Sequence, residues 1–234
     1  KSLISNHFNS EISSLALKDL NEKQWEKPKM FPLTSELQHF QKYVLDEAKK
    51  ACEYIKKDEQ VHVNFRKLTE IVMALTLLIN RKRIGEVQFL KVNTYTKHVE
   101  TKNAEEFLES FTESENMLTK HFKRVVTGGK GSKPVAILFP KNIQVFIDVL
   151  LSVRSKCVSN SNEYLFANPK TTNRWLSGYH TLRKLANLSG VPNPSLFTST
   201  RLRKQIATVL QVMNVSETEM EQFANFMGHT KKNP

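Results

Sequence analysis

The sequence predicts a mostly helical fold that carries one small antiparallel β-hairpin, an α+β class. Apolar residues recur at helical spacing along much of the 234-residue chain, which favours amphipathic helices. Two β-prone runs, 120–127 and 134–140, flank the glycine-rich segment 128–133, an arrangement that favours a hairpin. A hydrophobic content of 39% is enough for a sizeable core in one large domain or two small ones.

Two long helices are expected in the first third of the chain. Ser35 and Gln38 have the spacing of a capping box for a helix that ends near Lys57. A second helix over 64–80 is apolar enough around 72–79 to be central in the core. Further elements are expected as helices over 104–115, 141–157, 174–189 and from 200 onward, and as a short strand over 164–166.

The chain is expected to divide into two domains. Residues 21–32 are polar and include Pro28 and Pro32, which is typical of a linker. Residues 1–60 are therefore expected to form an N-terminal region of helices and linker, and 61–234 to form the main domain.

The positive charge of the chain is concentrated in its second half. Residues 1–117 hold 18 Lys and Arg and 18 Asp and Glu, whereas 118–234 hold 17 against 5 and so carry the whole net charge of +12. Within that half, 149–216 contains nine basic residues and one acid, Glu163. This asymmetry indicates a polyanion partner, since Lys and Arg displace counterions from phosphates. A basic soluble domain without such a partner is the alternative.

Several other classes of protein are disfavoured. The longest apolar runs, such as 71–79, are too short for a membrane span, and residues 1–20 show no signal-peptide pattern, so we expect a soluble intracellular protein. Cys52 and Cys157 have no CxxC motif and no nearby His, which favours free buried thiols over a disulfide or a metal site. The seven histidines are scattered, so no zinc cluster is expected.

Four short basic motifs follow one another along the chain. Arg83 stands in Arg-Ile-Gly-Glu directly after the expected core helix, and Glu86 three residues later can orient its guanidinium. Lys130 stands in the glycine-rich hairpin, Arg203 in Thr-Arg-Leu-Arg-Lys at a helix start, and His229 in Met-Gly-His. Because a strand rather than a helix follows the glycines, the hairpin is not a Walker-type phosphate loop.

The order and much of the spacing of these motifs resemble the catalytic domain of the tyrosine recombinases, the phage-integrase family. In that family one arginine lies in a GlRisEl helix, a lysine on a β-hairpin, a second arginine in HxLRH, and a His or Trp in LGH. The resemblance implies a tyrosine-recombinase-like catalytic domain over 61–234 and a remnant of a core-binding domain within 1–60. The long stretch between Arg83 and Lys130 is also similar to that of Crypton-type elements and of host genes derived from them.

The resemblance implies four catalytic residues and two supporting ones: Arg83, Lys130, Arg203 and His229, with Glu86 and Thr200. Two rigid arginines stabilise the extra negative charge of a phosphorane, the lysine protonates the leaving 5′-oxygen, and the histidine donates to the phosphate or helps to deprotonate the tyrosine. No metal or other cofactor is expected, because a 3′-phosphotyrosyl link conserves the phosphodiester energy. Further DNA contacts are expected at Lys123, Arg124, Lys133, Arg174, Arg201, Lys204, Lys231 and Lys232.

The sequence departs from the family pattern in two ways. Thr200 stands where the family has the His of HxxR, while His180 and Arg183 form an HxxR pattern further upstream. We prefer Arg203 as the second arginine, because its distance from His229 is close to the family spacing. All five tyrosines lie before His229, so the nucleophile is expected to be truncated from this chain, supplied by another chain, or lost.

Two functions of different classes follow from the sequence. The first is DNA integration and recombination, in which DNA is cut and rejoined through a 3′-phosphotyrosyl intermediate; this chain alone is expected to be inactive unless a nucleophilic tyrosine exists beyond residue 234. The second is a domesticated, catalytically inactive DNA-binding module derived from a transposon recombinase, and a type IB topoisomerase is a third. The expected partner is double-stranded DNA, with no membrane. The resemblance implies a homo-oligomer, a tetramer on two duplexes, and a nuclear location is expected.

Overall fold

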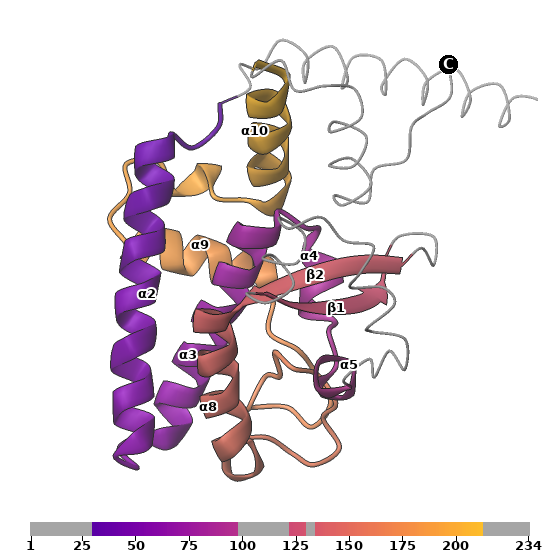
Figure 1. Cartoon of the computed structure of the whole chain (residues 1–234). Helices are drawn as coiled ribbons and strands as arrows, with labels where there is room; N and C mark the ends of the chain where they lie inside the picture. The colour runs from indigo at the N-terminus through magenta and orange to yellow at the C-terminus, as the bar shows by residue number, and fades with distance from the viewer. Residues whose placement is uncertain (1–29, 98–121, 130–133, 213–234) are drawn as a thin grey trace, which may run out of the picture. The chain divides into compact units, whose positions relative to one another are not determined.

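A computed structural model describes residues 30–97, 122–129 and 134–212 of the chain (Figure 1). They form the predicted mostly helical fold with one two-stranded antiparallel sheet. The elements are α2 (Thr34–Lys56), α3 (Val61–Asn80), α4 (Ile84–Gln88), α5 (Val92–Thr96), β1 (Phe122–Gly128), β2 (Pro134–Pro140), α8 (Lys141–Cys157), α9 (Gly178–Leu188), the 3₁₀ turn η2 (Pro194–Leu196) and α10 (Ser199–Val212). The helix predicted over 104–115 lies outside the described residues.

By compactness the chain divides into two units, Lys1–Phe31 and Pro32–Pro234. Both α2 and α3 belong to the second unit, where they pack side by side (Figure 1). Phe40, Val44 and Ala48 of α2 are fully buried in this packing. The predicted role of the N-terminal region as a core-binding remnant stays a prediction.

The central helix of the core is α3, as its apolar composition predicts. It packs against α2, α8 and α9 and also contacts α4, β2 and α10. The stretch from Ile71 to Leu75 is fully buried, and a helix surrounded in this way is apolar on all sides. Glu70, which precedes this stretch, is also buried and is paired with Arg66 and Lys184. Because several elements pack against α3, the position of the turn that follows Asn80 is determined by this packing.

The hairpin is attached to the end of α3 by side-chain hydrogen bonds. β1 and β2 pair antiparallel, with Val125 opposite Ile137 and both side chains buried. Asn80, the last residue of α3, accepts a hydrogen bond on Oδ1 from the Leu138 N–H at 2.7 Å and donates from Nδ2 to the Leu138 carbonyl at 2.8 Å. The end of the core helix and β2 are therefore held together by one buried amide.

Replacing Asn80 by alanine is expected to lower the free energy of unfolding by about 2 kcal/mol, because the N–H and C=O groups of Leu138 both lose a hydrogen-bond partner. Urea denaturation followed by circular dichroism measures this change. Asn187→Ala, at an exposed position of α9, is the control and should change stability by less than about 0.5 kcal/mol. Equal effects of the two substitutions would contradict a clamp by Asn80.

The first long helix begins differently from the prediction. It starts at Thr34, because the Glu36 carboxylate accepts a hydrogen bond from the Leu33 N–H at 2.7 Å. This contact satisfies a backbone donor of the first turn in the way that the predicted pair of Ser35 and Gln38 would have done. The helix itself is confirmed, and the prediction of its cap is wrong.

The short strand predicted at 164–166 is present only as an isolated bridge between Tyr164 and Lys91. The pairing is extended on its two sides by backbone hydrogen bonds from Val92 to the Glu163 carbonyl and from Leu165 to the Leu90 carbonyl. The segment is thus extended, as predicted, but has too few partners to form a ladder of the sheet.

Helix α9 begins later than predicted and lies close to α4. Trp175 forms an isolated antiparallel β-bridge with Ala167, so the helix starts at Gly178. A Cβ atom on Gly178 would lie 2.8 Å from Cγ2 of Ile84, which is closer than any side chain permits. The Gly178 N–H donates to Oε1 of Gln88 at 3.2 Å. Glycine at this position therefore lets α9 approach α4.

None of the described helices is long and apolar enough to cross a membrane. In the same part of the chain, no group of three or more His, Cys, Asp or Glu side chains is placed to hold a metal ion. Cys52 and Cys157 are both free and buried, and burial raises the pKa of the Cys52 thiol to about 11.

Candidate functional site

The candidate site is built where α3 ends and α4 begins. Arg81 adopts a left-handed backbone conformation with φ of 51°, which ends α3 at Asn80 and turns the chain. Arg83 is extended, with φ of −66° and ψ of 146°, and stands at the N-cap of α4. A non-glycine residue rarely adopts a positive φ. The packing around Arg81 must therefore stabilise this conformation, and it sets the position of the basic turn.

Arg83 and Glu86 form the ion pair that their spacing predicts. Nη1 of Arg83 donates to Oε1 of Glu86 at 2.9 Å, and the backbone N–H of Arg83 donates to Oε2 of the same carboxylate at 3.0 Å. The Glu86 side chain is 3% exposed, whereas the Arg83 side chain is 34% exposed. A buried carboxylate thus orients a guanidinium that is still accessible from solvent.

Helix α10 brings a second arginine to this turn. Ser199 Oγ donates to the backbone carbonyl of Lys82 at 2.8 Å, which fixes the first turn of α10 on the junction of α3 and α4. Arg203 follows one helical turn later and is partly buried. Burial lowers the pKa of Arg203, the charge of Arg83 lowers it further, and Glu86 acts in the opposite direction. The two arginines, far apart in the sequence, therefore lie in one electrostatic environment.

Lys82 is a third cation at this junction, and no role was predicted for it from the sequence. Its side chain is fully buried, which is rare for lysine. Burial lowers the pKa of Lys82 to about 8; Glu86 opposes this decrease, and Arg203 and Arg83 add to it. Three consecutive basic residues ordinarily indicate a solvated turn, so no local pattern distinguishes Lys82 from its neighbours.

We call Lys82, Arg83, Glu86 and Arg203 the cation cluster. Among the residues that the structure describes, it combines three cations with one carboxylate, and both Lys82 and Glu86 are buried. An excess of positive charge withdrawn from water is costly unless an anion compensates it. Guanidinium groups present paired donors that match the oxygens of a phosphate. The arrangement can therefore bind a tetrahedral oxyanion, such as one phosphate of a nucleic acid backbone.

The other predicted residues of α10 lie beside the cation cluster. Thr200 and Lys204 are exposed, whereas Arg201 is partly buried and its Nη1 donates to the Ser195 carbonyl at 2.6 Å. Thr200 thus stands on the surface.

The predicted contacts on β1 have different environments. The ammonium of Lys123 lies over the ring of Tyr95, 4.1 Å from its centroid, while Arg124 is exposed. A cation–π contact of this kind stabilises the position of Lys123 on the hairpin. The remaining predicted residues lie outside the described ones: Lys130, Lys133, His229, Lys231 and Lys232.

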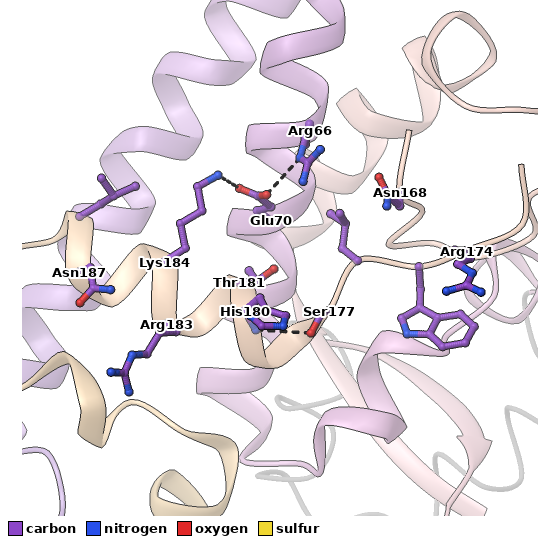
Figure 2. A pocket seen from close by; sticks show the side chains of 13 residues that line it. Arg66, Glu70, Asn168, Arg174, Ser177, His180, Thr181, Arg183, Lys184 and Asn187 are labelled. Atoms are coloured by element: carbon purple, nitrogen blue, oxygen red, sulfur yellow. Dashed lines mark hydrogen bonds and ion pairs between the residues drawn. The ribbon is translucent and has the colours of Figure 1, made fainter. Parts of the chain in front are cut away.

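Arg174 is placed apart from the cation cluster, in a groove of about 890 Å³ between α3 and α9. The groove is also lined by His180 and Arg183, the pair that forms the upstream HxxR pattern, but by neither of the cluster arginines. Figure 2 shows Arg66 and Lys184 directed at the carboxylate of Glu70 on one wall.

The HxxR pattern at 180–183 is therefore not part of the turn that holds Arg83. The sequence did not reveal this groove, because its residues come from three separate segments of the chain.

The fold is similar to those of solved site-specific recombinases. XerH bound to its difH substrate in a pre-cleavage complex is 18% identical, with a TM-score of 0.55, over 86% of this chain and 48% of that chain. XerH bound to palindromic difH substrate in a post-cleavage complex is 18% identical, with a TM-score of 0.53, over 87% of this chain and 47% of that chain. The XerA recombinase is 17% identical, with a TM-score of 0.48, over 88% of this chain and 57% of that chain.

No protein-family model and no curated protein matches the sequence. This chain spans about half the length of the XerH chains. The predicted fold class is confirmed: the protein has a mostly helical fold with a two-stranded sheet that is similar to XerH.

Proposed function

We propose that the domain binds the backbone of double-stranded DNA and that Arg83 and Arg203 grip one phosphate. The observation that carries this proposal is the convergence of the two arginines around one buried carboxylate, from the end of α3 and the start of α10. Each guanidinium is held by packing or by Glu86, so that little freedom is lost when it donates to a phosphate oxygen.

Two further findings support DNA as the partner. The net charge of +12 comes entirely from residues 118–234, and such an excess favours a polyanion. The fold is similar to that of XerH, whose solved complexes contain its difH substrate. Exposed cations at Arg124, Arg174 and Lys204 provide additional contacts to neighbouring phosphates.

The chemistry that we propose for this site is phosphodiester exchange. A tyrosine oxygen would attack the phosphorus, the bond to the 5′-oxygen would break, and the 5′-oxygen would take a proton from Lys130, leaving a 3′-phosphotyrosyl link. Arg83 and Arg203 would stabilise the charge that develops on the nonbridging oxygens. The tyrosine would come from another chain or from a segment beyond this sequence.

A second candidate function is DNA binding without strand cleavage, in a nuclear host protein derived from a Crypton-type element. Thr200 favours it, because this exposed residue stands where the tyrosine recombinases have a histidine and cannot relay a proton as an imidazole does. In this case the cation cluster would still hold a phosphate, and the homo-oligomer implied by the family would not be required.

The proposal is tested by the salt dependence of binding to a 30-base-pair duplex, measured by fluorescence anisotropy. We expect the affinity to fall at least about a hundredfold between roughly 50 and 200 mM NaCl, because several phosphates release counterions. Lys204→Gln should weaken binding and reduce the slope by about one counterion.

Lys49→Gln on α2 is the matched control, since Lys49 is an exposed lysine in the half of the chain that carries no net charge. It should leave both affinity and slope unchanged. An affinity that does not respond to salt would contradict the proposal.

A further inference from the structure

A second groove, of about 650 Å³, shares the ion-paired Glu70 with the groove in Figure 2. We call it the apolar groove; its lining includes Tyr43 and Glu47 of α2, Val63 and Lys67 of α3, Lys170, and Leu185 and Leu188 of α9. No residue of the cation cluster is among the described residues that line it. The apolar groove is therefore a surface separate from the proposed phosphate site.

Two bulky apolar side chains of this groove are exposed to solvent. Val63 near the start of α3 is 63% exposed, and Leu188 at the end of α9 is 58% exposed. Single exposed apolar residues are common on protein surfaces, but these two line the same concavity. A partner that covers them with apolar side chains removes both from water, which favours association.

The ion pairs at the groove bury their carboxylates and expose their cations. Glu47 pairs with Lys67, and Glu70 pairs with Arg66 and Lys184 (Figure 2). The side chains of Glu47 and Glu70 are 15% and 6% exposed. Those of Lys67, Arg66 and Lys184 are 42%, 38% and 53% exposed. An approaching partner therefore meets positive charge beside apolar side chains.

The same ion pairs hold together the helices that form the groove. Lys67 and Glu47 join α3 to α2, and Lys184 and Glu70 join α9 to α3. A groove whose walls are already connected needs little reorganisation when a partner binds, which lowers the cost of association.

We propose that the apolar groove is a docking site for an amphipathic helix of a partner protein, whose apolar face is flanked by Asp and Glu. Charge complementarity identifies this partner, because the exposed lysines attract carboxylates whereas Val63 and Leu188 require apolar contact. The walls are helices, whose backbone groups bond within each helix, so the matching mode of recognition is a helix laid in the groove and not an added strand. This inference goes beyond the proposed function and does not rest on it.

Duplex DNA is a poorer match to this groove. Its phosphates would attract the lysines, but its backbone has no apolar group that could cover Val63 and Leu188. A duplex is therefore not expected to compete with the helix.

The probe is a fluorescein-labelled peptide of about 16 residues, long enough for more than four helical turns. Leu recurs in it at intervals of three and four residues, with Glu beside each Leu. Its binding to the whole chain is measured by fluorescence anisotropy. We expect it to bind at least about tenfold more tightly than a peptide in which Gln replaces every Glu, and than a scrambled peptide of the same composition. If either control peptide binds as tightly as the probe, the proposal is overturned.

Val63→Ser should weaken binding of the acidic peptide about fivefold, because the variant loses apolar contact. Val145→Ser is the matched control, since Val145 is 54% exposed on α8 and does not line the groove. It should change the affinity less than about twofold. Both valines are exposed, so neither substitution is expected to unfold the domain. Equal losses in the two variants would count against the groove.

Lys170→Glu tests the charge separately. Lys170 is exposed, and its reversal should weaken binding of the acidic peptide about tenfold but that of the Gln peptide less than about twofold. Lys49→Glu on α2 is the control, because its side chain is 67% exposed and does not line the groove. It should weaken binding of the acidic peptide less than about threefold. A loss that is the same for both peptides would contradict charge complementarity.

Other occupants are distinguished by competition and by size. An excess of the 30-base-pair duplex should leave the peptide bound; if it displaces the peptide, the groove binds nucleic acid and the proposal is overturned. A dimer in sedimentation that the peptide dissociates would assign the groove to a second copy, with the same consequence. So would an affinity that rises more than about tenfold when Gln replaces the five glutamates within 103–117, because the chain's own acidic segment would then be the occupant.

Failure of this inference can be told apart from failure of the proposed function. Val63→Ser should bind the duplex as the wild type does, because Val63 lies outside the cation cluster. If the wild type binds the duplex but not the acidic peptide, only this inference fails. If it binds the peptide but not the duplex, only the proposed function fails.

Discussion

Replacing Arg203 by alanine is expected to weaken binding of the 30-base-pair duplex about thirtyfold while the domain stays folded. A charge-assisted hydrogen bond to a phosphate contributes about 2 kcal/mol, which corresponds to this factor. Arg203 is a partly buried cation that Arg83 repels, so its removal costs the folded state little. Fluorescence anisotropy measures the affinity, and thermal unfolding should show a melting temperature within about 3 °C of the wild type.

Arg83→Ala should weaken binding by a similar factor but should also destabilise the domain, because it leaves the buried Glu86 carboxylate without its guanidinium partner. The double variant gives the sharper result. Since both arginines are expected to contact the same phosphate, the loss in the double variant should be smaller than the product of the two single losses. Losses that multiply would indicate that the two side chains bind different phosphates.

Arg183→Ala is the control for the choice of motif. Arg183 belongs to the upstream HxxR pattern and lines the groove between α3 and α9. It should change the affinity less than about threefold, as expected for one exposed phosphate contact at moderate salt. If Arg183→Ala lowers the affinity for the duplex more than Arg203→Ala does, and Arg203→Ala has no effect, the second arginine of the site lies on α9 and not on α10.

The parts of the site that local spacing determines could be predicted from the sequence. A carboxylate three residues after an arginine can reach it within one helical turn, and the contact of Glu86 with Arg83 is present. The hairpin was also predictable, because two β-prone runs around glycines have few other ways to pair. Its attachment to α3 through Asn80 was not, since that contact joins residues 58 positions apart.

Lys82 shows why the rest could not be predicted. A lysine between two arginines is ordinarily solvated, but Lys82 is buried. Helix α10 packs on this turn through the hydrogen bond of Ser199, which lies 117 positions later in the chain. Such contacts are set by tertiary packing and leave no periodic signal in the neighbouring residues. The start of α2 was missed for a simpler reason, because Glu36 rather than Gln38 satisfies the first backbone donor.

The 234-residue chain is expected to form no covalent phosphotyrosyl adduct with DNA, because none of its five tyrosines has the required placement. A nucleophile must approach the phosphorus to about 3–3.5 Å in line with the leaving oxygen. Tyr95 is buried, and burial raises its pKa to about 12, which disfavours the phenolate. Tyr164 packs edge-on against Trp175, 5.1 Å between ring centroids, and Tyr43 and Tyr54 lie on α2.

Tyr179 is the strongest rival among these tyrosines. It is 48% exposed on α9 and follows Gly178, which lies against α4 next to the cation cluster. Its ring packs edge-on against His180, 5.4 Å between centroids, and His180 lines the groove between α3 and α9. The test incubates the chain with a nicked suicide duplex, in which a cleaved strand cannot be rejoined, and separates the products on a denaturing gel. A retarded protein–DNA band would refute the prediction, and its loss in Tyr179→Phe would identify Tyr179 as the nucleophile.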